Sequence, residues 1–375
     1  MKKEIAVKFN TITPLWTGDA WRENCEIRPS SLIGSLRFWF EVICYFSGIC
    51  KRKHFSPKLG RFEKEVNRKD FRNCLSNEGN SFEAKIKCLL EEDIPWPSIV
   101  FGTTNWKSLI SIKEIEYLDD YSFGNKLNLP YAIGIKKDNP ENIEEFQNKE
   151  DWKNKINSYG GGNFKEKLKK AKKEFSFFFF NNPYFYGNFQ VKFEVEEEII
   201  EPIFYPLLTF MKEYGFWGGK WNIGYGRLEI LKIKENDNPI HNWEKEIFLF
   251  SKINGKIGDK SFECFVRNNV SDFNTLKQKN RKIQLFISYY SKNSFINVIK
   301  ELIGTKAKER VKFRINTEER HKIFGKTGSP RSLSYVPQGS KILPFINKTE
   351  RNEFSYDCGF LSITGLLNLE GENNG

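Results

Sequence analysis

The sequence predicts an α+β protein with two domains, each built on a β-α-β-β-α-β order of strands and helices. Three observations predict this class. Apolar and polar residues alternate at the start of the chain, as in a half-buried strand. An apolar segment with helical spacing then follows a proline–serine start signal. A second helix, a glycine-rich loop and a final strand come later, and this order is typical of the ferredoxin-like (RRM-like) fold.

The first domain is expected over residues 1–233. Its first strand is indicated by the alternation of Ile5, Val7 and Phe9 with polar neighbours, and its first helix follows Pro29, with Ser30 as the N-cap. The remaining elements are expected at residues 97–102, 175–180, 189–195, 202–214 and 227–233. The residues from about 103–174, rich in Lys, Asn and Glu, are predicted to be a large insertion.

A polar run after the last of these strands predicts a linker over residues 234–246. Residues 247–375 are then expected to form a second, degenerate ferredoxin-like domain. Its strands and helix are indicated by apolar segments at 248–250, 283–287, 295–302 and 361–363.

Basic residues outnumber acidic ones. The chain has 60 Lys and Arg against 48 Asp and Glu, a formal charge of +12 that favours a polyanionic partner. The first residues run directly into a strand pattern and leave no room for a signal peptide. The most apolar stretch, 32–50, contains Arg37 and Glu41 and is expected to be a buried helix, not a membrane span. A cytoplasmic protein is therefore expected.

The seven cysteines include no Cys-x-x-Cys pair and are expected to be reduced structural thiols. A zinc site made by Cys74, Cys88 and His54 stays open as an alternative. Otherwise the sequence predicts no metal, no cofactor and no catalytic residue, because convincing acidic clusters are lacking and only three histidines occur.

A short glycine-rich loop is the most informative stretch of the chain. Its glycines permit positive φ and close backbone approach, its bases donate charge-assisted hydrogen bonds, and its tryptophan offers a stacking face. The loop therefore predicts an RNA-binding site, with a simple glycine-rich turn as the alternative. Its candidate RNA-binding residues are Gly218, Gly219, Lys220, Trp221, Asn222, Gly224 and Arg227.

The start of the first helix is a second candidate. Arg28, Ser30, Ser31 and Arg37 are predicted to form a phosphate-binding patch, because free amides at a helix N-terminus attract anions. The alternative is a capping serine with two surface arginines. Trp16 precedes this helix and is a candidate stacking face, with core packing as its alternative. We expect the glycine loop to approach this helix start, so that both face one groove.

Several motifs resemble the RAMP superfamily of CRISPR-associated proteins, and within it the first subunit of the type III-B Cmr complex. The motifs are Ile12–Gly18, Ile27–Phe40, Ile99–Gly102, the glycine loop, and Ile323–Gly325 followed by Ser329–Arg331. The resemblance implies two ferredoxin-like domains and a non-catalytic, RNA-binding subunit of a crRNA-guided complex. Such a subunit holds the crRNA 3′ region, helps to capture target RNA and contacts other Cmr subunits. Arg331 joins the candidate RNA contacts on this basis.

Two other functions stay open. A RAMP endonuclease that processes crRNA precursors would use His54 as general acid or base, because histidine titrates near neutral pH. A basic interaction scaffold without RNA contact is the other alternative.

Overall fold

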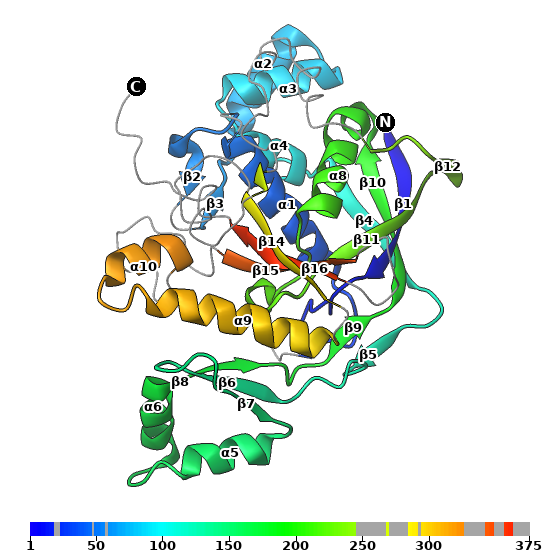
Figure 1. Cartoon of the computed structure of the whole chain (residues 1–375). Helices are drawn as coiled ribbons and strands as arrows, with labels where there is room; N and C mark the ends of the chain where they lie inside the picture. The colour runs from blue at the N-terminus through cyan, green and yellow to red at the C-terminus, as the bar shows by residue number, and fades with distance from the viewer. Residues whose placement is uncertain are drawn as a thin grey trace.

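The computed structural model describes residues 1–18, 23–46, 49–56, 59–244, 268–269, 284–291, 294–325, 342–348 and 356–362. It is a mixed α+β structure (Figure 1). Its largest described sheet, which we call the central sheet, has five antiparallel strands in the order β12-β11-β1-β10-β4. These strands are β1 (Lys2–Thr11), β4 (Ile110–Tyr117), β10 (Asn188–Glu196), β11 (Leu228–Glu235) and β12 (Asn238–Ile240). Helices α1 (Pro29–Phe46) and α8 (Tyr205–Glu213) connect strands of this sheet.

Alternating side chains fix the register of the central strands. Along β10 the odd-numbered apolar residues are buried and their polar neighbours are partly exposed. Val191 pairs with Val7 of β1, and Phe189 pairs with Phe9, whose ring stacks on it at 5.2 Å. A slip of one residue would turn these apolar side chains to the polar face, so the pattern specifies the pairing. The strands predicted from the alternation at Ile5–Phe9 and at 189–195 are thereby confirmed as β1 and β10.

Strand β4 is the main correction to the predicted elements of this domain. It lies inside 103–174, which we expected to be an insertion, yet it pairs with β10 at the end of the central sheet. Residues 97–102 instead include the short helix α4 (Trp96–Phe101), and β8 (Phe175–Phe179) belongs to another sheet. As an end strand with few buried side chains, β4 carries a weak apolar signal.

Much of the rest of 103–174 contributes to a small second layer, whose Ile133 and Ile135 pack in one buried cluster with Val298 and Ile299 of α9. Strands β7 (Ile143–Phe146), β6 (Ala132–Lys136) and β8 form an antiparallel sheet. This sheet lies below α9 in Figure 1, together with α5 (Lys149–Asn157) and α6 (Phe164–Glu174). Strands β5 (Ser122–Gly124) and β9 (Tyr184–Tyr186) form a two-stranded ribbon.

The polar run predicted as a linker begins with a hairpin. Asn236 and Asp237 have φ of 46° and 67°, and they connect β11 to β12, which continues the central sheet. Two residues with positive φ are the geometry of the common two-residue hairpin turn. Residues 234–240 thus belong to the first sheet, and the predicted linker boundary is wrong there.

The C-terminal half contains a four-stranded sheet in the order β13-β14-β16-β15. Its elements are β13 (Asn268–Asn269), β14 (Gln284–Ser291), α9 (Phe295–Val311), α10 (Thr317–Phe324), β15 (Ile342–Lys348) and β16 (Tyr356–Ser362). The strand and helix predicted at 283–287 and 295–302 are confirmed, whereas 248–250 lies outside the described residues. Leu343, Phe345 and Leu361 join the core cluster around α1, so the two halves share buried apolar contacts.

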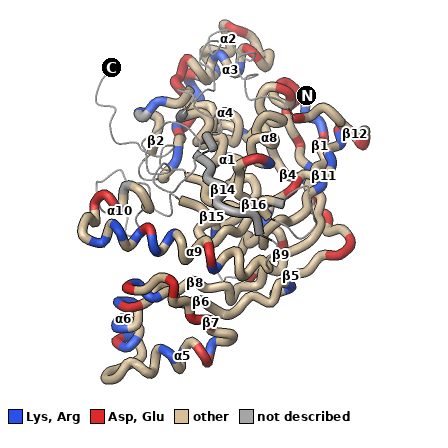
Figure 2. Tube along the Cα trace, in the orientation of Figure 1, with Lys and Arg blue, Asp and Glu red and all other residues tan. Residues whose placement is uncertain are grey.

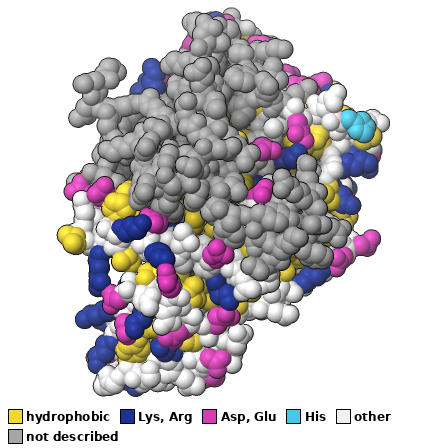
Figure 3. All heavy atoms as spheres, in the orientation of Figure 1, with side chains coloured by type: hydrophobic (Ala, Val, Ile, Leu, Met, Phe, Trp, Pro, Cys, Tyr) yellow, Lys and Arg dark blue, Asp and Glu magenta, His cyan; other side chains and the backbone are white. Residues whose placement is uncertain are grey.

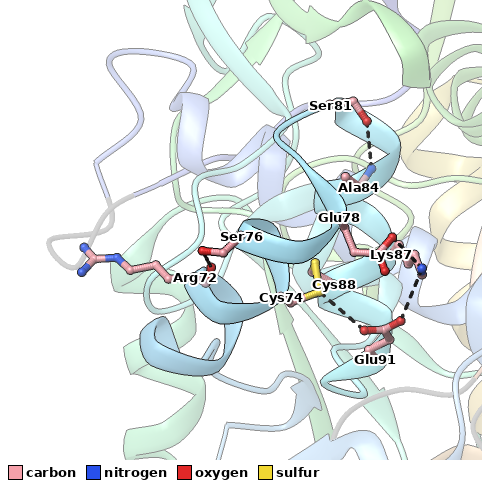
Figure 4. The surroundings of a disulfide bond; sticks show 9 residues. All are labelled: Arg72, Cys74, Ser76, Glu78, Ser81, Ala84, Lys87, Cys88 and Glu91. Atoms are coloured by element: carbon pink, nitrogen blue, oxygen red, sulfur yellow. Dashed lines mark hydrogen bonds and ion pairs between the residues drawn. A yellow bond between two sulfur atoms is a disulfide. The ribbon is translucent and has the colours of Figure 1, made fainter.

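A helical pair beside the main body holds a disulfide. Cys74 of α2 (Arg68–Glu78) and Cys88 of α3 (Phe82–Glu91) are bonded, with their Cα atoms 5.8 Å apart (Figure 4). The expectation of reduced thiols is wrong for this pair, because the two helices pack with these side chains face to face. The bond also removes both sulfurs from the zinc site considered with His54. Short elements η1 (Arg52–His54), β2 (Phe55–Ser56) and β3 (Arg61–Phe62) precede the pair.

Candidate functional site

The glycine loop between α8 and β11 is fastened to the segment that precedes α1. The amide of Gly219 donates to the Trp16 carbonyl at 2.8 Å, and the amide of Gly226 donates to the Pro14 carbonyl at 2.9 Å. The amide of Gly218 donates to Oγ of Ser35, in α1, at 2.9 Å. The loop therefore contacts α1 at Ser35, beyond its first turn, whereas we expected contact at the start of the helix.

Two glycines of the loop are required by close backbone contacts. Gly218 has φ of 67°, and a Cβ there would lie 2.4 Å from the Trp16 carbonyl oxygen. Gly226 has φ of 93°, and a Cβ would lie 2.1 Å from the carbonyl oxygen of Trp217. Both the backbone conformation and the space exclude a side chain. The sequence correctly singled out this loop for close approach, although the approaching backbone is the protein's own.

Lys220 is the base of the loop that stays partly exposed. It adopts a left-handed conformation, with φ of 61°. Its Nζ lies 5.3 Å from the centre of the Trp16 ring and donates to Oδ1 of Asn182 at 3.1 Å. The Trp16 indole N–H is buried and has no hydrogen-bond acceptor in the part of the chain that the structure describes. Asn222, in η3 (Trp221–Ile223), is exposed nearby in the chain.

The start of α1 is organised by Thr17 rather than by Ser30. The helix begins at Pro29, a residue whose fixed φ suits a first helical position, so Ser30 lies inside the first turn. Thr17 Oγ1 accepts from the Arg28 amide at 3.1 Å and donates to Oδ1 of Asn24 at 3.2 Å. Ser31 Oγ donates to the Thr17 carbonyl at 3.2 Å. The Ser30 side chain is exposed, and Arg28 is partly exposed.

Arg227 does not face the predicted groove. Its side chain is fully buried, and its guanidinium donates to carbonyls at the C-terminal end of α8 and just beyond it. Nη2 lies 2.9 Å from the Lys212 carbonyl oxygen and 3.1 Å from that of Glu213. Burial lowers the pKa of Arg227 to about 9, so the group stays charged at neutral pH. The charge interacts favourably with the negative end of the helix dipole. The prediction that Arg227 faces the groove is therefore wrong.

Arg37 is likewise occupied inside the protein. Its guanidinium bonds Glu41 at 3.0 Å, Glu63 at 3.2 Å and the Gly102 carbonyl at 3.0 Å. It links α1 to β3 and to the end of α4, and its side chain is only 12% exposed. Arg37 therefore joins structural elements and does not belong to the surface patch predicted with Arg28, Ser30 and Ser31.

Trp221 and Gly224 make packing contacts. The Trp221 ring stacks on Trp39 of α1 at 5.8 Å, and its indole N–H donates to the Trp217 carbonyl at 3.3 Å. Gly224 has φ of 80°, and a Cβ there would lie 2.8 Å from Cδ1 of Ile299 in α9. These contacts join the loop to both halves of the core. The last predicted contact, Arg331, lies outside the described residues.

His54 is part of a separate cluster. Its Nε2 lies 3.0 Å from Oδ1 of Asp93, and its Nδ1 accepts from the Lys51 amide at 3.1 Å. Hydrogen bonds to Cys50 and Asp93 raise the pKa of His54. Both ring nitrogens are thus engaged by the protein. Within the described ranges, no group of three or more potential metal ligands occurs, and no helix has the length and apolarity needed to cross a membrane.

Three residues of the site were missed in the sequence. Ser35 accepts a hydrogen bond from the Gly218 amide, and Asn182 accepts one from the Lys220 ammonium. Thr17 accepts one from the Arg28 amide at the start of α1. A signal existed only for Ser35, which lies four residues after Ser31 and hence on the same helical face. The partners of Thr17 and Asn182 are decided by chain segments that meet only in the folded protein.

The chain was compared with solved structures, with curated sequences and with the sequence patterns of protein families. The chain is similar to Cmr1 from Pyrococcus furiosus in its apo form, with 14% identity, a TM-score of 0.38, and coverage of 96% of this chain and 87% of the other. It is also similar to a chain of a type III-B Cmr-beta complex bound to cognate target RNA, with 14% identity, a TM-score of 0.39 and coverage of 98% of each chain. A search of curated protein sequences finds no match. Residues 8–229, more than half of the chain, match the sequence pattern of the RAMP superfamily, and the chain therefore belongs to that superfamily.

Proposed function

We propose that this chain is a non-catalytic, RNA-binding subunit of a crRNA-guided type III-B CRISPR (Cmr) effector complex. In this role it holds the 3′ region of crRNA, helps to capture target RNA, and contacts crRNA, target RNA and other Cmr subunits. The proposal also treats both halves of the chain as ferredoxin-like domains. Membership of the RAMP superfamily supports it, together with the net charge of +12.

The observation that carries the proposal is the hydrogen bond between Gly218 and Ser35. It brings the glycine loop, with Lys220 and the exposed Asn222, against the helix that begins beside Arg28, Ser30 and Ser31. Lysine and arginine supply charge, and hydroxyls and amides at a helix start supply donors for phosphate oxygens. Trp16 is partly buried against the core, and the Lys220 ammonium lies over its ring, so the ring helps to position this charge.

The test is RNA binding over a salt series. Lys220→Ala combined with Arg28→Ala removes two proposed phosphate contacts, so the log–log salt slope for single-stranded RNA should become shallower by about 1.4. Lys113→Ala is a charge-matched control for one substitution, since Lys113 pairs with Glu4 at 2.8 Å on the central sheet. Unaltered affinity and slope in the double variant would contradict the proposed site.

The absence of catalysis is tested on the same protein. Labelled RNA should stay intact with or without Mg²⁺. Cleavage that disappears in His54→Ala would instead establish the processing-endonuclease alternative. Stable copurification with Cmr subunits, but without RNA, would favour the interaction scaffold.

A further inference from the structure

Three basic residues lie near the connection between α9 and α10, which the Arg314–Asp138 ion pair joins to the end of β6. They are Lys137, Arg310 and Arg320, which we call the α9–α10 basic cluster. Figure 2 marks Lys and Arg positions along the chain in α9, α10 and α6, and Figure 3 shows Lys and Arg side chains on the surface of this side of the molecule. Burial lowers the pKa of Lys137, the charges of Arg310, Arg314 and Arg320 lower it further, and the charge of the neighbouring Asp138 opposes them. Burial and the charge of Arg320 likewise lower the pKa of Arg310. Each of the three cations is therefore within electrostatic reach of the other two.

The cluster differs from its neighbours because its three residues form none of the ion pairs found among the described residues, and Asp138, beside Lys137, is itself paired with Arg314. Basic residues next to it are paired: Arg314 with Asp138 at 2.6 Å and Lys312 with Glu309 at 2.6 Å. Among the residues that the structure describes, no carboxylate lies within ion-pairing distance of Lys137, Arg310 or Arg320. Nε of Arg320 is also buried without a hydrogen-bond acceptor. The Lys137 ammonium donates a hydrogen bond to the carbonyl of Lys172, near the C-terminal end of α6.

Holding like charges together without an anion costs free energy, and an anion with several acceptor oxygens removes that cost. Arginine guanidinium groups match the geometry of phosphate oxygens, and a lysine beside them adds a point charge. We propose that the α9–α10 basic cluster is a second RNA contact, which binds phosphates of the same RNA strand as the glycine loop. This inference rests on the proposed function.

The position of the cluster on α9 favours RNA over an acidic protein segment. Gly224 of the glycine loop lies against Ile299, in the first half of α9. Arg310 follows eleven residues later on the same helix, about 16 Å away at the usual helical rise. One helix thus connects both basic sites, and a polymer with evenly spaced phosphates can contact the two together.

The test compares two double variants of the full chain. Arg310→Ala with Arg320→Ala should weaken binding of single-stranded RNA and make the log–log salt slope shallower by about 1.4. Lys308→Ala with Lys312→Ala makes the same change in net charge at the end of α9, but both lysines are ion-paired within the protein. The control should leave the slope nearly unchanged. If Arg320→Ala prevents folding, Arg310→Gln alone should make the slope shallower by about 0.7.

A chemical readout tests the place of contact. Acetylation of Lys137 should slow several-fold when RNA is bound, and Arg310→Ala with Arg320→Ala should abolish this protection. Equal slope changes in the two double variants, or no protection of Lys137, would overturn the inference. So would a double arginine variant that keeps RNA affinity but loses binding to another Cmr subunit. If the Lys220 variant binds RNA more weakly but the double arginine variant binds it as wild type does, the inference is overturned and the proposed function is not. Wild-type protein that binds no RNA would overturn both.

Discussion

The amide of Gly218 donates a hydrogen bond of 2.9 Å to Oγ of Ser35, which itself donates to the Ser31 carbonyl at 2.9 Å. The serine hydroxyl therefore joins the glycine loop to α1 and uses both its donor and an acceptor position. Because Gly218 also lies against the Trp16 carbonyl, the loop has little freedom to shift. The position of Lys220, two residues later, depends on this connection.

Replacing Ser35 with Ala should destabilise the protein and weaken RNA binding. The partly buried Gly218 amide would lose its acceptor, which costs about 1 kcal/mol in the free energy of unfolding. Urea unfolding measures this loss, and fluorescence anisotropy measures RNA affinity. Ser30→Ala, at an exposed position in the same helix, should change stability much less. Equal stability of the Ser35 variant and wild type would show that this hydrogen bond does not hold the loop.

Arg227→Met should reduce stability by at least about 3 kcal/mol, since carbonyls at the end of α8 would lose a charged donor. The RNA salt slope of the folded variant should match that of wild type, because the guanidinium is buried. Thermal unfolding and a salt titration separate the two effects. A shallower slope with unchanged stability would return Arg227 to the RNA-contact set.

Trp221→Ala should also act mainly on stability. Its ring stacks on Trp39 and contacts Phe38 at 5.1 Å, so truncation should cost about 3 kcal/mol. Trp221→Phe keeps part of this packing and should cost less. The melting temperature and RNA affinity are measured together. A large loss of affinity without a change in melting temperature would indicate base stacking on this ring.

Reduction of the Cys74–Cys88 bond should destabilise the protein by about 3 kcal/mol, the value expected when a loop of about 15 residues is closed. The double variant Cys74→Ser, Cys88→Ser should reproduce this loss, measured by urea unfolding without reductant. Adding reductant to that variant should have no further effect. If reductant destabilises wild type and variant equally, the bond is not the source of the loss.

Burial raises the pKa of Glu41 to about 7, although Arg37 donates to this carboxyl and opposes the shift. Between its ordinary pKa of 4.5 and about 7, the folded chain keeps a proton that the unfolded chain releases. Stability from this group is therefore complete below pH 4.5 and falls as pH rises to about 7, by about 3 kcal/mol at most. In Glu41→Gln the unfolding free energy should lose this component. A variant with the same pH profile as wild type would contradict the assignment.

The sequence by itself determined the elements whose signal is local. The alternation along residues 189–195 fixed a half-buried strand, because side chains in a strand face opposite sides in turn. The glycines at 218 and 226 marked positions where a side chain cannot fit. The motifs around α1 and the glycine loop were also sufficient to predict membership of the RAMP superfamily.

Only the tertiary structure decided which polar groups reach solvent. Arg28, Arg37 and Arg227 are alike in the sequence, but Arg37 meets two glutamates and Arg227 meets the end of α8, whereas Arg28 stays partly exposed. The place of β4 was hidden for the same reason, since it is set by pairing with β10, more than seventy residues away in the chain. Burial and pairing depend on segments that are distant in sequence, and local patterns carry no record of which segments meet.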